Sequence, residues 1–134
     1  LDKLVIEVPL TGFTPEKIDN LAKLVTAKAP LLMTALGVAD LPIQQTDDTL
    51  RFPWFQGNLD DDTVRAYTTL VAKICDTAKE KHRITAKERG FDNPKYAMRC
   101  WLLSLGFIGE EYKQMRKILL NNLKGNSSYR SRVR

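Results

Sequence analysis

The residues that could carry nucleophilic chemistry in this chain of 134 residues are two cysteines and one histidine. Cys75 and Cys100 both lie among apolar residues in helical patterns, which predicts buried, reduced and unreactive thiols. His82 follows Ala78 by four residues, and an imidazole at a helix C-terminus caps or packs against the last turn. One histidine and two distant cysteines do not have the spacing of a zinc site. We therefore predict no catalytic residue, no metal and no cofactor.

Two acidic clusters could bind a metal or act as paired catalytic carboxylates. A calcium loop that began with Asp60-Asp61-Asp62 would need glycine at its sixth position and glutamate at its twelfth, where the chain has Arg65 and Val71. The three aspartates instead predict a helix N-terminus, where negative charge is favourable. Glu110 and Glu111 are adjacent and project to different sides of a helix, so they predict a second helix start. Neither cluster indicates a site.

The more specific chemical signal is a set of basic residues in the C-terminal half. Residues 1–67 carry 6 Lys+Arg and 10 Asp+Glu, whereas residues 68–134 carry 15 and 6, so the two halves have net charges of −4 and +9. Positive side chains spread over a surface bind phosphates and release the counterions around them. The candidate nucleic-acid-binding residues are Arg83, Lys87, Arg89, Arg99, Lys113, Arg116, Lys117, Lys124, Arg130 and Arg132. The alternative is a basic surface that is only solvated.

The last predicted helix places its basic residues on one solvent face, largely opposite its apolar residues: Lys113, Arg116, Lys117 and Lys124. Together with the helix predicted over 94–105, the helix over 110–123 has helix–turn–helix proportions, with the basic helix in the recognition position. Two amphipathic helices around a short turn also occur in any helical protein.

The composition of the whole chain indicates one globular domain. The net charge is +5, with 43% hydrophobic and 28% charged residues, which excludes a collagen-like or wholly disordered chain. No run approaches the roughly 18–20 apolar residues of a membrane span. Two cysteines are too few for a disulfide scaffold. We predict a cytoplasmic protein with no membrane partner.

The N-terminal third predicts a strand followed by a helix. Apolar residues alternate over 4–8, which is typical of a strand with one buried face. Thr14 and Pro15 then form a helix start, with a capping side chain followed by a proline in the first turn. Pro30 is expected to end or kink this helix, although a helical pattern resumes over 31–36.

A hairpin is predicted next, with strands over 43–45 and 50–54 around a polar turn. Its second strand buries Leu50, Phe52 and Trp54 on one face. Because Pro53 lacks an N–H donor, the strand is expected to end there or to lie at a sheet edge.

The rest of the chain predicts helices. The first runs from the aspartates to about His82, a loop covers 83–92, and two more helices follow. We predict an α+β fold in which a small sheet of about three strands, one N-terminal strand plus a hairpin, is covered by four to five helices, with an all-helical C-terminal half. A single domain is expected over 2–125, followed by a flexible basic tail over 126–134.

Several stretches resemble a known family. They are FPWF (52–55), RITAKE (83–88), KYAMRC through LGFIG (95–109), EYK through RKILL (111–120) and GNS (125–127). They resemble the C-terminal domain of the "virulence-related" protein family of Firmicutes conjugative transposons, over about residues 4–128. The resemblance implies a cytoplasmic accessory protein of a mobile element. It implies no activity, and its context favours a DNA-linked or regulatory role.

The preferred function is therefore a non-enzymatic accessory or regulatory domain that binds DNA or RNA through its basic C-terminal helix. The alternative is a protein-interaction module, in which Phe55, Phe91 and Phe107 form an exposed apolar patch beside predicted turns. An enzyme with a cysteine nucleophile is the least favoured function.

Overall fold

The computed structural model describes residues 2–81 and 93–125 as a small antiparallel sheet covered by helices. The elements in chain order are β1 (Asp2–Pro9), α1 (Pro15–Leu36), β2 (Gln44–Gln45), β3 (Thr49–Gly57), α2 (Asp61–Glu80), α3 (Pro94–Leu105), the 3-10 turn η1 (Glu110–Tyr112) and α4 (Lys113–Leu120). The predicted α+β fold is confirmed, with its N-terminal strand, its hairpin and its helical C-terminal part. His82, the predicted loop over 83–92 and the predicted tail over 126–134 lie outside the described residues.

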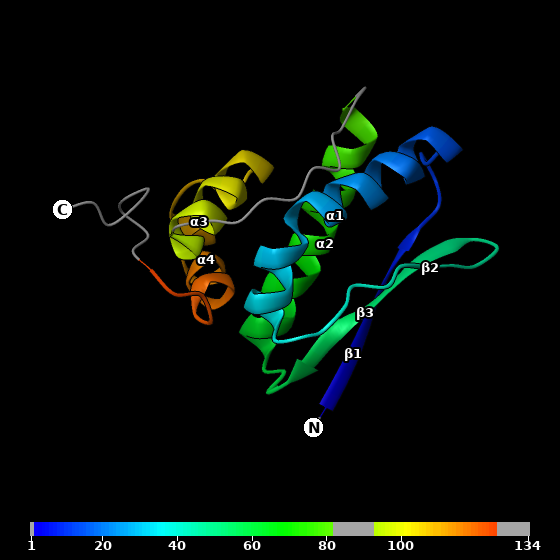
Figure 1. The fold of residues 1–134 in the computed structure, drawn as a ribbon. Coiled ribbons are helices and arrows are strands. Elements are labelled where there is room, and N and C mark those ends of the chain that lie inside the picture. The colour runs from blue at the N-terminus through cyan, green and yellow to red at the C-terminus, as the bar shows by residue number, and fades with distance from the viewer. Residues whose placement is uncertain (1, 82–92, 126–134) are drawn as a thin grey trace.

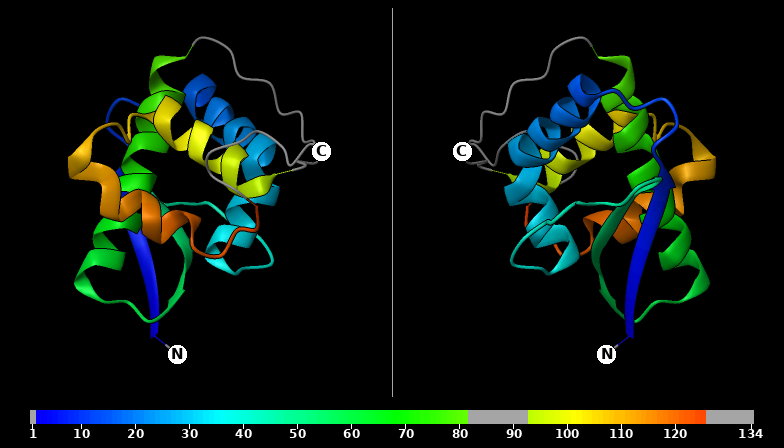
Figure 2. Two further views of the ribbon diagram at one scale, coloured as in Figure 1. Left: turned by 90° about the vertical axis from the view of Figure 1, so that its left-hand side faces the viewer. Right: turned by 90° about the vertical axis from the view of Figure 1, so that its right-hand side faces the viewer.

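The elements form three layers, which Figure 1 shows from the side. The sheet is one outer layer, α1 and α2 pack side by side in the middle, and α3 and α4 form the other outer layer. Figure 2 shows the α3–α4 layer in its left view and β1 in front of the helices in its right view. The sheet and the basic C-terminal helices α3 and α4 therefore lie on opposite sides of the molecule.

The central strand of the sheet is β3, because the strand order is β1-β3-β2. The prediction that Pro53 ends the strand or lies at a sheet edge is therefore wrong. The register with β1 shifts between Leu4 and Ile6, so that Pro53 and Trp54 together face one residue of β1. Such a bulge tolerates a residue without an N–H donor. On its other side, β2 pairs only with residues 50 and 51, so no ladder bond from Pro53 is needed there.

Helix α1 begins as predicted and continues further than predicted. Thr14 Oγ1 accepts a hydrogen bond from the backbone N–H of Lys17 at 3.2 Å. Pro30 does not end the helix, which runs without interruption to Leu36. A proline inside a helix costs about 3 kcal/mol. Leu31 and Leu32 directly after it are 2% and 0% exposed, and burying two leucines contributes a stabilisation of about the same size.

The hydrophobic core extends through all three layers. The predicted apolar face of β3 is confirmed, since Leu50, Phe52 and Trp54 are at most 1% exposed. Fully buried residues of the middle and outer helices continue this core: Leu21, Leu32, Leu70, Ile74, Met98 and Leu102. Within the described residues, no helix combines the length and the apolar character needed to cross a bilayer.

Candidate nucleic-acid interface

The α3–α4 layer is held together by its two ends. At its start, Asn93 caps α3, because its Oδ1 accepts from the N–H of Tyr96 at 3.1 Å. The chain returns to the same place after α4, where the N–H of Lys95 donates to the carbonyl of Lys124 at 3.0 Å. Gly106 (φ 108°) ends α3 in a left-handed conformation that favours glycine. These contacts hold the segment after α4 against the start of α3.

Five of the ten candidate basic residues lie in this layer, and the other five are outside the described residues: Arg83, Lys87, Arg89, Arg130 and Arg132. Lys113 and Lys117 are exposed on α4, one turn apart. Lys124 is also exposed, but it lies beyond the end of α4, so the predicted helix over 110–123 is too long. Arg99 is half-buried on α3. Residues 93–125 contain six Lys+Arg and two Asp+Glu, so this layer carries a net positive charge.

Arg116 does not belong to the predicted solvent face. Its Nη1 donates to the carbonyl of Phe107 at 2.8 Å and to that of Gly109 at 3.0 Å. The guanidinium therefore fills the turn between α3 and η1, where carbonyl groups would otherwise lack donors. Its spacing on the helix predicted exposure, but the tight turn before the helix folds back toward it.

Several lysines elsewhere in the described part of the chain form an ion pair or a cation–π contact with another side chain. Lys23 pairs with a carboxylate one turn away at 3.0 Å. Lys28, Lys73 and Lys79 lie over aromatic rings, with Lys73 Nζ 4.7 Å from the ring centre of Tyr112. In contrast, no ion pair or ring contact involves Lys113, Lys117 or Lys124 within residues 2–81 and 93–125. These three cations are available to an anionic partner.

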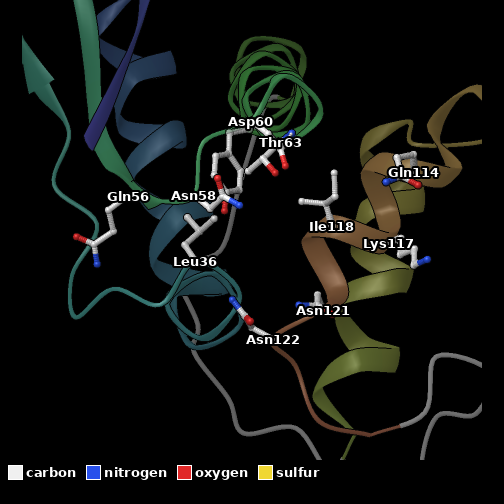
Figure 3. A pocket seen from close by; sticks show the side chains of 11 residues that line it. Leu36, Gln56, Asn58, Asp60, Thr63, Gln114, Lys117, Ile118, Asn121 and Asn122 are labelled. Atoms are coloured by element: carbon white, nitrogen blue, oxygen red, sulfur yellow. Dashed lines mark hydrogen bonds between the residues drawn. The ribbon is translucent and has the colours of Figure 1, made fainter. Parts of the chain in front are cut away.

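A polar cleft of about 430 Å³ opens beside α4. It lies between α4, the end of α1 and the N-terminus of α2, and Figure 3 shows Ile118 pointing into it while Lys117 lies on the outer side of α4. Five amide side chains line it: Gln56, Asn58, Gln114, Asn121 and Asn122. These residues come from separate parts of the chain, so no spacing in the sequence indicated them. The size is within the range of small-ligand sites.

The amides of the cleft differ in what they already bind. Asn122 Nδ2 donates to the carbonyl of Ala35 at 2.9 Å, which attaches the end of α4 to α1. Gln56 Nε2 lies 3.4 Å from the carbonyl of Gly37, a long bond. The side chains of Asn58, Gln114 and Asn121 have no partner among the described residues. They can donate and accept hydrogen bonds with a ligand.

The wall opposite α4 is acidic. Asp60 Oδ1 accepts from the N–H of Thr63 at 2.8 Å as the cap of α2, and this hydrogen bond lowers the pKa of the carboxyl. Tyr67 also lines the cleft, with its ring stacked on Phe55 at 4.6 Å between centroids. Burial, followed by the nearby charge of Asp60, raises the pKa of Tyr67. The hydroxyl of Tyr67 therefore remains protonated and neutral.

Within the described residues, the apolar patch expected for a protein-interaction module is not formed. Phe55 and Phe107 are 3% and 0% exposed, because the bulge of β3 turns Phe55 into the core and the turn after α3 covers Phe107. Phe91 lies outside the described residues. The turn instead exposes Ile108, at 64%.

The two cysteines differ from each other, and the prediction that both are buried is wrong for Cys100, which is exposed on α3. Burial raises the pKa of Cys75 to about 12.

We expect a thiol reagent such as Ellman's reagent to modify one thiol per folded chain at neutral pH, because only the thiolate reacts. Cys100→Ser should remove this reaction, and Cys75→Ser should leave it unchanged. Modification of both thiols in the folded chain would contradict the burial of Cys75.

Among residues 2–81 and 93–125, no three His, Cys, Asp or Glu side chains come together in a way that could hold a metal ion. Compared with known proteins, the chain matches no protein-family model, no curated protein and no solved structure. Its function therefore has to be inferred from its own residues.

Proposed function

We propose that the protein binds single-stranded nucleic acid along α4, with phosphates on the lysines and bases in the amide-lined cleft. The observation that supports this most is the position of Lys117. It is exposed, it has no acidic partner in the described part of the chain, and it lies at the rim of the cleft. Lys113 continues the same row one turn earlier, so the backbone of a strand can follow the helix.

The charge of the two cleft walls favours one strand over a duplex. Lys117 lines the α4 side of the cleft, with Lys113 one turn earlier on the same helix, whereas Asp60 lines the α2 side and is followed by the exposed Asp61 and Asp62. A duplex brings two phosphate backbones, and the second would approach these carboxylates. A single strand places its one backbone on the lysines and turns its bases toward the amide side chains of the cleft.

The unpartnered amides suit the edges of nucleobases. Asparagine and glutamine carry both a donor and an acceptor, so they form paired hydrogen bonds with base edges. Gln114 is on α4 beside the lysines, Asn121 directly follows the helix, and Asn58 lines the cleft from the β3–α2 connection. A phosphate-binding surface alone would not need these groups.

Removing the two lysines tests this proposal. We expect Lys113→Ala/Lys117→Ala to weaken binding of a fluorescent single-stranded oligonucleotide about tenfold or more at low salt. Since each lost phosphate contact on a single strand removes about 0.7 from the slope of log K against log salt, the slope should fall by about 1.4. Fluorescence anisotropy at several salt concentrations measures both quantities. The matched control Lys17→Ala/Lys23→Ala removes the same charge from α1.

The outcomes separate the alternatives. Equal losses in the two double variants would show that only net charge matters and would contradict a site on α4. Tighter binding of a duplex than of a single strand of the same sequence would contradict the cleft. An unchanged affinity in Asn58→Ala/Gln114→Ala would restrict the interface to phosphate contacts. DNA and RNA strands of matched sequence are compared in the same assay.

This function agrees with what the resemblance implies, a non-enzymatic accessory protein of a mobile genetic element. Such a protein would act in the cytoplasm on strands exposed during transfer or transcription. Arg83 and Arg130, two of the other predicted contacts, lie outside the described residues.

A further inference from the structure

Strand β1 lies at the edge of the sheet. Within residues 2–81 and 93–125 it pairs with β3 alone, because β2 lies on the other side of β3, and its outer edge has no partner strand there. Two of its core-facing residues, Leu4 and Val8, are only half-buried, although Ile6 between them is 8% exposed. On the opposite face, Lys3, Val5 and Glu7 are exposed, and Val5 is 37% exposed. An edge of this length with an exposed valine at its centre can accept another strand.

The direction of the backbone groups identifies which residues would pair. Leu10 donates its N–H to Asp48 on the hairpin side. In an antiparallel ladder the hydrogen-bonding groups of successive residues alternate in direction. The N–H and C=O groups of Lys3, Val5 and Glu7 therefore point to the free edge. These are the same three residues whose side chains form the exposed face.

We propose that this edge binds the same edge of a second copy of the chain, antiparallel, with Val5 opposite Val5 on the two-fold axis. Lys3 of each copy then lies opposite Glu7 of the other, so the pairing contains two cross-strand pairs of opposite charge and one apolar pair. A two-fold interface must be self-complementary, and the sequence Lys-x-Val-x-Glu on this edge has that property.

Neighbouring registers lack this complementarity. Moving one copy by two residues places Lys3 opposite Val5, or Val5 opposite Glu7, and the opposite-charge pairs are lost. Glu7 keeps a free oxygen for the new contact. Its Oε2 lies 3.0 Å from Arg51 Nε, as an ion pair without the alignment of a hydrogen bond, and its side chain is half exposed.

Pairing would join the two sheets into one of six strands and cover the half-buried Leu4 and Val8. Helix α4 lies in the layer opposite the sheet, so its lysines would remain accessible in both copies (Figure 2). The Gln56 end of the cleft lies nearer to the edge, because Gln56 pairs with Lys3 of the same copy. The proposal does not depend on the proposed function. In this proposal the protein-interaction surface is the edge of β1, whereas the sequence predicted a patch of Phe55, Phe91 and Phe107.

Cysteine cross-linking tests the register directly. In a background of Cys100→Ser, which removes the exposed thiol, Val5→Cys should form a covalent dimer on mild oxidation with diamide. Residues opposite each other on hydrogen-bonded strands have Cα atoms about 5.5 Å apart, which suits a disulfide. Lys3→Cys and Glu7→Cys should each stay monomeric, because two copies of residue 3 are then about 13 Å apart along the strands. A mixture of the two variants should cross-link.

Light scattering on the unmodified chain gives the second test. We expect a mass that rises with concentration from 15.3 kDa toward twice that value. Val5→Lys places two positive charges on the axis and should raise the dissociation constant at least tenfold, whereas Val5→Ile should not. Because Val5 is exposed, the variants should fold normally, and circular dichroism of each variant is the control for this. A monomeric mass at every concentration would overturn the proposal. So would equal cross-linking of Val5→Cys and Lys3→Cys when each variant is oxidised separately.

Discussion

Replacing Gly125 by alanine is expected to destabilise the domain by about 2–5 kcal/mol. Gly125 has a φ of 117°, which side chains rarely adopt, and a Cβ there would overlap Oδ1 of Asn93 and lie 2.9 Å from its Cγ. Asn93 cannot move away easily, because it is 2% exposed and caps α3. The alanine therefore adds backbone strain and also disrupts the cap. Urea denaturation followed by circular dichroism measures the loss.

A second glycine supplies the matched control. Gly57 has a similar φ of 106°, but nothing lies within 4 Å of a Cβ built on it. Gly57→Ala therefore measures the backbone strain alone. Its loss of unfolding free energy should be smaller than that of Gly125→Ala, which also includes the clash with Asn93 and the disrupted cap. Asn93→Ala combined with Gly125→Ala removes the clash, so the double variant should lose less than the sum of the two single losses. Equal losses in both glycine variants would contradict the role given to Asn93.

This contact also affects the proposed interface. The chain that returns from α4 to α3 carries Lys124, whose carbonyl accepts from Lys95. If Gly125→Ala loosens this closure, Asn121 and Asn122, which directly follow α4, lose their position beside the cleft. Oligonucleotide binding should then weaken in Gly125→Ala at a temperature where Gly57→Ala binds normally.

Local signals in the sequence predicted three helix starts correctly, whereas the start predicted at Glu110 is the 3-10 turn η1 and α4 begins only at Lys113. Thr14, Asp60 and Asn93 each accept a hydrogen bond from the backbone N–H three residues later, and a proline follows two of them in the first turn. Each signal depends on side chain and backbone groups within four residues. Such features are independent of the rest of the fold, which is why they can be read before the fold is known.

The two internal prolines show why other features could not be predicted. Pro30 continues a helix because the residues after it bury against distant elements, and Pro53 is tolerated because the bulge lies opposite β1. Both outcomes depend on contacts across the chain. The candidate site follows the same rule. The lysines of α4 were predicted from their spacing, but the role of Arg116 depends on a turn, and the cleft depends on packing of α1, α2 and α4.

The largest effect in the sheet is expected at Trp54. Its side chain is 1% exposed, and its ring lies edge-on to Phe52 at 5.1 Å and 6.0 Å from Phe55. Its Nε1 donates to the carbonyl of Pro42 at 2.7 Å, which attaches the segment after α1 to the sheet. Removing a buried tryptophan side chain costs about 3–5 kcal/mol. Trp54→Ala should lose this much, measured by urea denaturation at an unchanged m-value.

Trp54→Phe separates packing from the hydrogen bond. Phenylalanine keeps most of the ring but has no N–H, so the carbonyl of Pro42 loses its donor, at a cost of about 1–3 kcal/mol. Gln56→Ala, two residues further on the exposed surface, should change stability by less than about 0.5 kcal/mol. If Trp54→Ala cost no more than Trp54→Phe, the ring would not be a packing centre. If Trp54→Phe cost nothing, the bond to Pro42 would not hold the segment. Because the bulge places Trp54 in the core together with Phe55, the expected order of losses also tests whether the bulge at Pro53 determines how the sheet is packed.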